Sequence, residues 1–352
     1  MSFHINRSPF LVQIEVLKQL EINEIFLMSL CSRKMKTLVQ RIRLRPKKIR
    51  YSLDDNETQV SVGFTESDEK LHHMAKVKHV SYIPVDEMTS QQLGGERIEC
   101  RYSKNSLTEV FTFTLEHLEE NDKNVLALLQ NHCARLFSNK PRIQLEIYSV
   151  ATLMLSGIIN DVKDTSFICE KLNTSEIRRY LRMHSNHESV QVRSRCQGRV
   201  FTKKSKLLKM DGLSILRTGA MTPTIMHNFS GRFLLLQNSV LCYQQWSEVI
   251  RKWKNKEAYH KLHAMIANNP KPLPNVLNWI PLLREFNALH WDGSRRPQYF
   301  KLDPKFVETI HFPQCDPEDI DCTDWLDIEQ DGGNKWASIQ MTAAQIRFFV
   351  WN

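Results

Sequence analysis

An unusually apolar segment near the amino terminus limits what this chain can fold into. Between residues 9 and 39, apolar side chains recur at helical spacing, and residues 25–30 are apolar on almost every side. A helix that is apolar on every side must be covered on every side. About thirty residues are too few to enclose such helices by themselves. Either the rest of the chain or a partner protein must therefore cover the surplus.

The segment also has an ordered pattern: a proline before a first apolar helix, a second apolar helix, and a Ser-Arg step into a third. The parts are Pro9, Phe10-Leu11, Val16-Leu17, Ile25 to Leu30 and Ser32-Arg33. This pattern resembles the F-box, and the stretch SLCSRKMKTLVQ is similar to the F-box families of nematodes. The resemblance assigns residues 6–50 to a three-helix F-box and residues 51–352 to a substrate-binding region.

The F-box resemblance implies a partner, the Skp-type adaptor, and through it the cullin of a ubiquitin ligase. The side chains expected to bind the Skp-type adaptor are Pro9, Phe10, Leu11, Leu17, Ile25, Leu27, Leu30 and Leu38. The residues alone leave another interpretation open, in which these helices form a hairpin that packs on its own domain.

Composition favours a folded protein without a membrane segment. The chain has 352 residues, of which 41% are hydrophobic and 25% charged, as in soluble multi-unit proteins. No apolar run approaches the roughly 18 residues that cross a bilayer. The eight cysteines form no C-x-x-C pair, and several lie in apolar runs, which is typical of reduced thiols. We therefore expect a cytoplasmic or nuclear location.

Short alternating runs after the first helices predict strands, joined by tight connections that favour antiparallel pairing. The predicted strands cover residues 48–53, 59–64, 77–83, 97–102 and 110–115, with a turn at Gly94-Gly95. Residues 121–137 carry one apolar face and predict a helix, followed by a strand at 143–148.

The second half alternates strand-like and helix-like stretches. Apolar centres lie near residues 168, 192, 215, 235, 262 and 289. One helix is predicted to begin at Asn173, where Glu176 completes a capping box, and another covers residues 243–254. A strand pair is expected at residues 337–341 and 347–351. Parallel pairing is favoured. The expected fold class is α+β or α/β: a three-helix F-box, then a mixed strand–helix domain compatible with a degenerate repeat.

Part of the carboxy-terminal half, at about residues 230–350, is similar to the nematode F-box-associated domain. The similarity rests on Trp253, the turn 254–256 and Leu262, and on Asp327-Ile328 followed by Trp336-Ala337-Ser338-Ile339. The loop between the last two elements is one residue shorter than in that family, and Glu329-Gln330 replace its usual basic residues. The resemblance implies a non-catalytic substrate adaptor for an unknown protein substrate.

Motifs for catalysis or cofactor binding are missing from the sequence. It has no G-x-G-x-x-G, P-loop, H-E-x-x-H or G-x-S-x-G pattern, so phosphate binding, zinc proteolysis and hydrolase chemistry lack their usual signatures. We expect no cofactor, and the F-box resemblance implies a protein without enzymatic activity. Three loose metal candidates are His184/His187, His260/His263 in an expected strand, and His311 with Cys315 and Cys322. None has the spacing of a zinc site, and we expect no bound metal.

Charge is unevenly distributed along the chain, whose formal net charge is +9. The most basic part of the second half, residues 178–209, contains a single acid, Glu188. The side chains expected to contact a substrate are Arg193, Arg195, Arg199, Lys203 and Lys204. Such a run could also follow phosphates, but no nucleic-acid-binding motif accompanies it, so that alternative is disfavoured. Another alternative is a protein that binds the Skp-type adaptor without entering a ligase.

Overall fold

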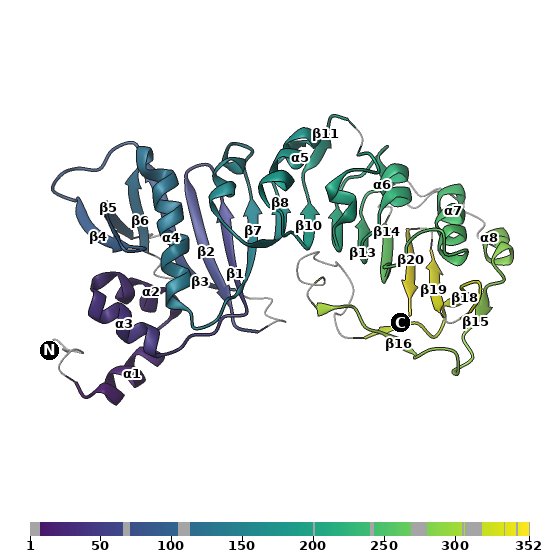
Figure 1. Ribbon diagram of the computed structural model, residues 1–352, viewed down its shortest axis with the longest axis horizontal. Helices are drawn as coiled ribbons and strands as arrows, with labels where there is room; N and C mark the ends of the chain where they lie inside the picture. The colour runs from purple at the N-terminus through teal and green to yellow at the C-terminus, as the bar shows by residue number, and fades with distance from the viewer. Residues whose placement is uncertain are drawn as a thin grey trace. The chain divides into compact units, whose positions relative to one another are not determined.

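The structure is a computed structural model, shown in Figure 1. It describes residues 8–65, 71–104, 113–199, 201–239, 243–268, 280–304, 306, 319–333, 335–342 and 344–351. The chain divides into two compact units, residues 1–162 and 163–352. The fold class predicted from the sequence is confirmed: three amino-terminal helices precede a mixed arrangement of strands and helices.

The three predicted helices are α1 (Phe10–Lys18), α2 (Ile22–Cys31) and α3 (Arg33–Arg41). Each begins at a residue suited to that position. Pro9 precedes α1 and needs no backbone N–H there. At α2, Glu21 and Glu24 form a reciprocal capping box. The Ser32 hydroxyl accepts a hydrogen bond from the Met35 N–H at 3.1 Å, which starts α3 immediately after α2 ends.

A seven-stranded mixed sheet follows the helices in the first unit, in the order β7-β1-β2-β3-β6-β5-β4. Its strands are β1 (Lys48–Leu53), β2 (Glu57–Gly63), β3 (His72–Val80), β4 (Thr89–Leu93), β5 (Glu96–Lys104), β6 (Phe113–Leu118) and β7 (Arg142–Ile147). Four neighbouring pairs are antiparallel. Three of them join predicted strands, and the fourth pairs β5 with β4, a strand that the sequence did not predict.

Two pairings in this sheet are parallel. The pairing of β3 with β6 contradicts the predicted antiparallel arrangement, whereas the sequence predicts no direction for β7. Strand β6 lies beside β3 because the β4–β5 hairpin intervenes in sequence and lets the chain return in the same direction. Strand β7 lies beside β1 because α4 (Asp122–Leu136) provides the crossover that parallel strands require. The turn at Gly94-Gly95 is confirmed as the connection between β4 and β5.

Parallel strands form the centre of the second unit, as predicted. Strands β8 (Val162–Phe167), β10 (Ser189–Val192), β12 (Gly212–Ile215), β13 (Phe233–Leu236) and β14 (Ala264–Asn268) pair in that order. Ser189, Gly212, Phe233 and Ala264 occupy equivalent positions along this ladder. The predicted centres at residues 168 and 262 lie just outside β8 and β14.

Helices α5 (Thr174–Met183), α6 (Thr222–Asn228) and α7 (Tyr243–Lys254) connect successive parallel strands. The predicted capping box at Asn173 and Glu176 begins α5. One helix and two short strand pairs lie outside the parallel ladder. The helix is α8 (Ile280–Glu285), and the pairs are β9 (Lys171–Asn173) with β11 (Arg195–Gln197) and β16 (Tyr299–Phe300) with β17 (Ile320–Asp321). Short 3₁₀ turns cover Glu119–Asn121, Ala151–Leu153, Leu155–Ile158 and Lys206–Lys209.

Antiparallel strands complete the second unit. Strand β20 (Gln345–Val350) pairs with β14, and β19 (Trp336–Met341), β18 (Leu326–Glu329) and β15 (Leu289–His290) follow. The predicted carboxy-terminal strand pair is confirmed. A core of aromatic and aliphatic side chains packs between this part and the parallel strands; it includes Phe233, Ile266, Phe300, Trp325 and Phe349.

Candidate partner-binding surfaces

The first turn of α1 presents apolar side chains to solvent. Phe10 is 46% exposed, Leu11 74% and Val12 44%. Pro9, which is also exposed, begins the helix by accepting the Gln13 N–H at 3.0 Å. The Arg41 guanidinium on α3 lies 5.1 Å from the centre of the Phe10 ring. Three consecutive exposed apolar residues on one turn are typical of a surface that another molecule covers.

The inner sides of the same helices belong to the core of the first unit. Of the predicted adaptor-binding residues, Leu17, Ile25, Leu30 and Leu38 are 0–7% exposed, and Leu27 is half-buried. Helix α2 packs against α3, β3 and β4, and α3 also packs against α4. The structure therefore combines features of both interpretations of the sequence. The inner faces of the helices pack on their own domain, and the first turn of α1 leaves apolar side chains exposed to a partner.

A hydrogen-bond chain through His132 joins α2 to the body of the unit. The Gly94 N–H donates to His132 Nδ1 at 3.3 Å, so the opposite nitrogen carries the proton of the neutral ring. That Nε2–H donates to the Ser29 hydroxyl at 2.8 Å, and Ser29 in turn donates to the Phe26 carbonyl at 2.5 Å. The Phe26 ring meets the imidazole edge-on at 5.5 Å.

Burial and the positive charges of Lys36 and Arg135 lower the His132 pKa to about 3. The imidazole is therefore neutral near pH 7, as the hydrogen-bond chain requires. Sequence reasoning did not identify Ser29 or His132. The available signal was that His132 falls on the otherwise apolar face of the predicted helix over residues 121–137.

Further hydrogen bonds fix the segment that leaves α3. The Gln40 side chain donates to the Arg135 carbonyl at 2.7 Å, and the Ser138 N–H donates to the Leu44 carbonyl at 3.0 Å. The Asn139 side chain donates to the Pro46 carbonyl at 2.7 Å. Residues up to 47 are thus bonded to the end of α4 and the loop after it.

Comparison with models of protein families assigns the helices that carry this surface to a known domain. Residues 9–47 match the family model of the F-box domain. The chain contains an F-box. An F-box indicates an adaptor that binds the Skp-type subunit of cullin-based ubiquitin ligases, and F-box proteins are generally non-catalytic subunits. Neither the search of curated proteins nor the search of solved structures found a match.

The predicted substrate residues lie before, on and after β11 in the second unit. Arg195, Arg199, Lys203 and Lys204 are exposed, and Arg193 is half-buried. None of them forms an ion pair with the residues that the structure describes. The structure brings Arg195 and Arg199 close to the beginning of α5, because β11 pairs with β9 and the Thr174 hydroxyl donates to the Arg199 carbonyl at 2.9 Å.

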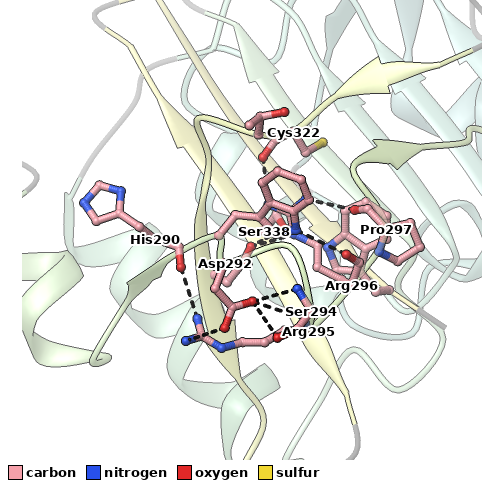
Figure 2. A network of polar contacts seen from close by, with 12 residues as sticks. His290, Asp292, Ser294, Arg295, Arg296, Pro297, Cys322 and Ser338 are labelled. Carbon is pink, nitrogen blue, oxygen red and sulfur yellow. Dashed lines mark hydrogen bonds and ion pairs between the residues drawn. The ribbon is translucent and has the colours of Figure 1, made fainter.

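A buried ionic network joins strands β18 and β19 to Arg296, which precedes β16, as Figure 2 shows. Arg296 donates through Nε to Asp327 at 2.9 Å and through Nη2 to the Cys322 carbonyl at 2.7 Å. Ser338 on β19 donates to Asp327 at 2.6 Å and accepts from the Trp351 indole at 2.7 Å. Asp327 lies on β18 and Ser338 on the neighbouring β19, so the hydrogen bond between them helps to hold the two strands together.

The structure gives no support to the metal candidates that it describes. His184 is buried at the end of α5, and His187 Nε2 lies 2.7 Å from the Thr165 hydroxyl in a buried cluster. His260 and His263 precede β14 rather than lying in a strand, since β14 begins at Ala264. Across the described ranges, no group of three or more metal-binding side chains gathers. His311 and Cys315 lie outside those ranges.

Two further sequence predictions concern thiols and membranes. Cys100, Cys133, Cys169 and Cys322 are buried free thiols, Cys196 is half-buried, and Cys31 is exposed. The helices in the described parts of the chain include none with the length and hydropathy to cross a bilayer.

Proposed function

We propose that this protein is a substrate adaptor of a Skp–cullin–F-box ubiquitin ligase. The observation that supports the proposal is an F-box whose first helical turn exposes Phe10, Leu11 and Val12 while its inner faces are part of the folded unit. Residues 51–352 would hold a protein substrate. We extend the proposal to a cytoplasmic or nuclear location, where such ligases act.

Docking would be stabilised by covering the exposed first turn. Removing a large apolar side chain from water contributes roughly 1.5 to 3 kcal/mol before the costs of association are subtracted. Of the residues expected from the sequence, Pro9, Phe10 and Leu11 are exposed and Leu27 is half-buried, so the proposal assigns docking to these four, with Val12 added.

The adaptor would act through effective concentration rather than bond chemistry. A substrate tethered near the ubiquitin-carrying enzyme meets it as if at high local concentration. The F-box is bonded to the rest of the first unit through His132 and through the end of α4. We propose that this connection limits the directions in which the docked F-box can point relative to its own unit.

Capture by a purified Skp-type adaptor tests the proposal. The double variant Phe10→Asp/Leu11→Asp should lose capture and keep its unfolding temperature, because both side chains are exposed. Leu289→Asp is the matched control, since Leu289 is 45% exposed in the second unit. Leu17→Asp and Ile25→Asp are unsuitable because they would unfold the first unit.

The results separate the alternatives. If the wild-type chain is not captured, or if the α1 double variant is captured as well as wild type, the docking proposal is wrong. Capture of the adaptor without recruitment of a cullin would identify a protein that acts outside a ligase.

A further inference from the structure

We infer that the basic strip of the second unit binds an acidic or phosphorylated peptide segment, and that this is the chemical class of the substrate. The basic strip is defined as Lys171, Arg195, Arg199, Lys203 and Lys204, all of them exposed. The inference rests on the proposed function for its biological meaning. The binding surface itself lies entirely in the second unit.

Two like charges stand side by side at one end of the basic strip. Strands β9 and β11 are parallel, and Lys171 and Arg195 occupy partner positions in their register. Like charges directly opposite each other destabilise a sheet. Neither side chain forms an ion pair with a residue in the described ranges. An anion bound between them would relieve the repulsion.

The segment after β11 brings the other cations alongside α5. At the beginning of the helix, the Thr174 hydroxyl donates to the Arg199 carbonyl at 2.9 Å. At its end, Lys206 Nζ donates to the Leu181 and His184 carbonyls at 2.8 and 2.7 Å. Arg199 and Lys206 are therefore held at the two ends of α5, and Lys203 and Lys204 lie between these anchors in sequence.

A glycine makes the close approach at the first anchor possible. Gly198 has a φ of +98°, and a Cβ there would come within 2.7 Å of Asn173 Oδ1. Glycine adopts such a positive φ without strain. The position of Arg199 next to the start of α5 is thus set by the backbone at Gly198 together with the buried Thr174 hydroxyl.

The length and charge of this surface suit a short extended peptide. A helix of ten residues, as α5 is, rises about 15 Å, a distance that about five extended residues span. Arg179 and Arg182 on α5 are exposed and add positive charge. Among nearby acids, Glu176 is used in the helix cap at 2.7 Å from the Asn173 N–H, and Glu170 borders the strip. Arginine pairs with carboxylates and phosphates through two parallel hydrogen bonds.

Nucleic acid fits the same surface less well. Single-stranded nucleic acids are bound by basic grooves in which bases stack on exposed aromatic rings. The aromatic residues near the strip are Phe167, Tyr180 and Phe201, and each is at most 1% exposed. Among the residues that the structure describes here, the surface therefore offers charge without a stacking platform, and an acidic protein segment is the favoured occupant.

Fluorescence anisotropy with the purified full-length chain tests the inference. The probes are a short labelled peptide rich in Asp and Glu around a central serine, its phosphoserine form, and a single-stranded oligonucleotide. We expect both peptides to bind, the phosphoserine form more tightly, with affinity falling as salt rises. Arg195→Glu/Arg199→Glu should weaken peptide binding at least about tenfold.

A control with the same change in charge is Lys261→Glu/Lys335→Glu, at two exposed positions of the second unit away from the strip. It should leave peptide affinity within about twofold of wild type. Equal loss in both double variants would mean unspecific attraction by net charge and would overturn the inference. Tighter binding of the oligonucleotide, or no peptide binding at all, would overturn it as well.

Capture by the Skp-type adaptor is measured on the same variants. The strip variant should be captured like wild type, because the changed residues lie in the second unit and the F-box in the first. If the chain binds the peptides but is not captured, the proposed function fails and the binding surface stands. If it is captured but does not bind them, the surface inference fails alone.

Discussion

The imidazole of His132 lies 2.8 Å from the hydroxyl of Ser29, and this pair connects an F-box helix to the helix that covers the first sheet. Both side chains are at most 3% exposed. Each has a second partner, the Gly94 N–H for the imidazole and the Phe26 carbonyl for the hydroxyl. The F-box is therefore part of the first unit's core and is not a separate module on a linker.

Removing the Ser29 hydroxyl should destabilise the first unit. Ser29→Ala leaves the His132 Nε2–H buried without an acceptor, which costs about 1 to 3 kcal/mol. Ser81→Ala, at an exposed position, should change the free energy of unfolding by less than about 0.5 kcal/mol. Denaturant unfolding of both variants measures the difference, and equal stability would show that the hydrogen bond contributes nothing.

Acid should weaken the first unit through His132. Its pKa is about 3 in the folded protein and near 6.5 in the unfolded chain, so the unfolded state binds the proton first. Stability is complete above about pH 6.5 and is lost as the pH falls toward 3, by at most about 1.4 kcal/mol per pH unit. His132→Gln should lower stability at pH 7 and flatten this slope between pH 6 and 4.

A matched control for the pH measurement lies in the second unit. Burial, with the nearby charge of His184, lowers the His187 pKa to about 3 as well. His187→Gln should flatten the acid response of the second unit and leave that of the first unchanged. An unaltered slope in the His132 variant would contradict the assignment of a neutral, buried imidazole.

Two leucines on α1 should respond oppositely to substitution. Leu17 is 0% exposed and Leu11 is 74% exposed. Leu17→Ala should cost about 2 to 5 kcal/mol of stability because it leaves a cavity in the core. Leu11→Ala should change stability by less than about 0.5 kcal/mol while weakening capture by the Skp-type adaptor. Thermal unfolding and pull-down on the same preparations separate the two effects.

The buried ion pair of the second unit should be far more sensitive than a surface pair. Asp327→Ala leaves the Arg296 guanidinium, whose side chain is 1% exposed, buried without its carboxylate, which costs about 3 to 5 kcal/mol. Asp331 pairs with Lys254 at 2.9 Å but is 56% exposed. Asp331→Ala should therefore cost no more than about 1 kcal/mol. Comparable losses in chemical denaturation would argue against a structural role for the network.

Gly94 should tolerate no side chain. Its φ is +64°, and a Cβ would lie 2.6 Å from the Leu128 carbonyl oxygen on α4. Gly219 has a φ of +49°, and a Cβ added there would meet nothing within 4 Å. Gly219→Ala should cost about 1 to 2 kcal/mol from backbone strain alone. Gly94→Ala should cost more, because α4 must also move, and a smaller loss than in Gly219→Ala would refute this reasoning.

Periodic patterns predicted much of the fold, because local sequence determines where a helix or strand begins. Ser32, Asn173 and Glu176 identified two helix starts that the structure confirms. Alternation of apolar stretches correctly predicted the parallel ladder from β8 to β14. Strand β4 was missed because its residues, TSQQL, include a single apolar side chain.

The candidate site was only partly accessible to the same reasoning. The sequence located the F-box and its apolar residues, and the family comparison supports the domain at residues 9–47. It could not tell Leu11 from Leu17, which are both leucines on one helix. Exposure depends on which side of α1 meets α3, and that is a property of packing.

The sequence by itself determined most of the elements, two helix starts and the presence of an F-box, since these depend on neighbours in the chain. Only the tertiary structure decided which apolar residues of the F-box remain exposed. It also decided that Ser29 meets His132, that Arg296 meets Asp327, and that Lys171 and Arg195 stand side by side. Each of these relationships joins residues far apart in sequence, and such contacts are set by the packing of whole elements, which no local pattern encodes.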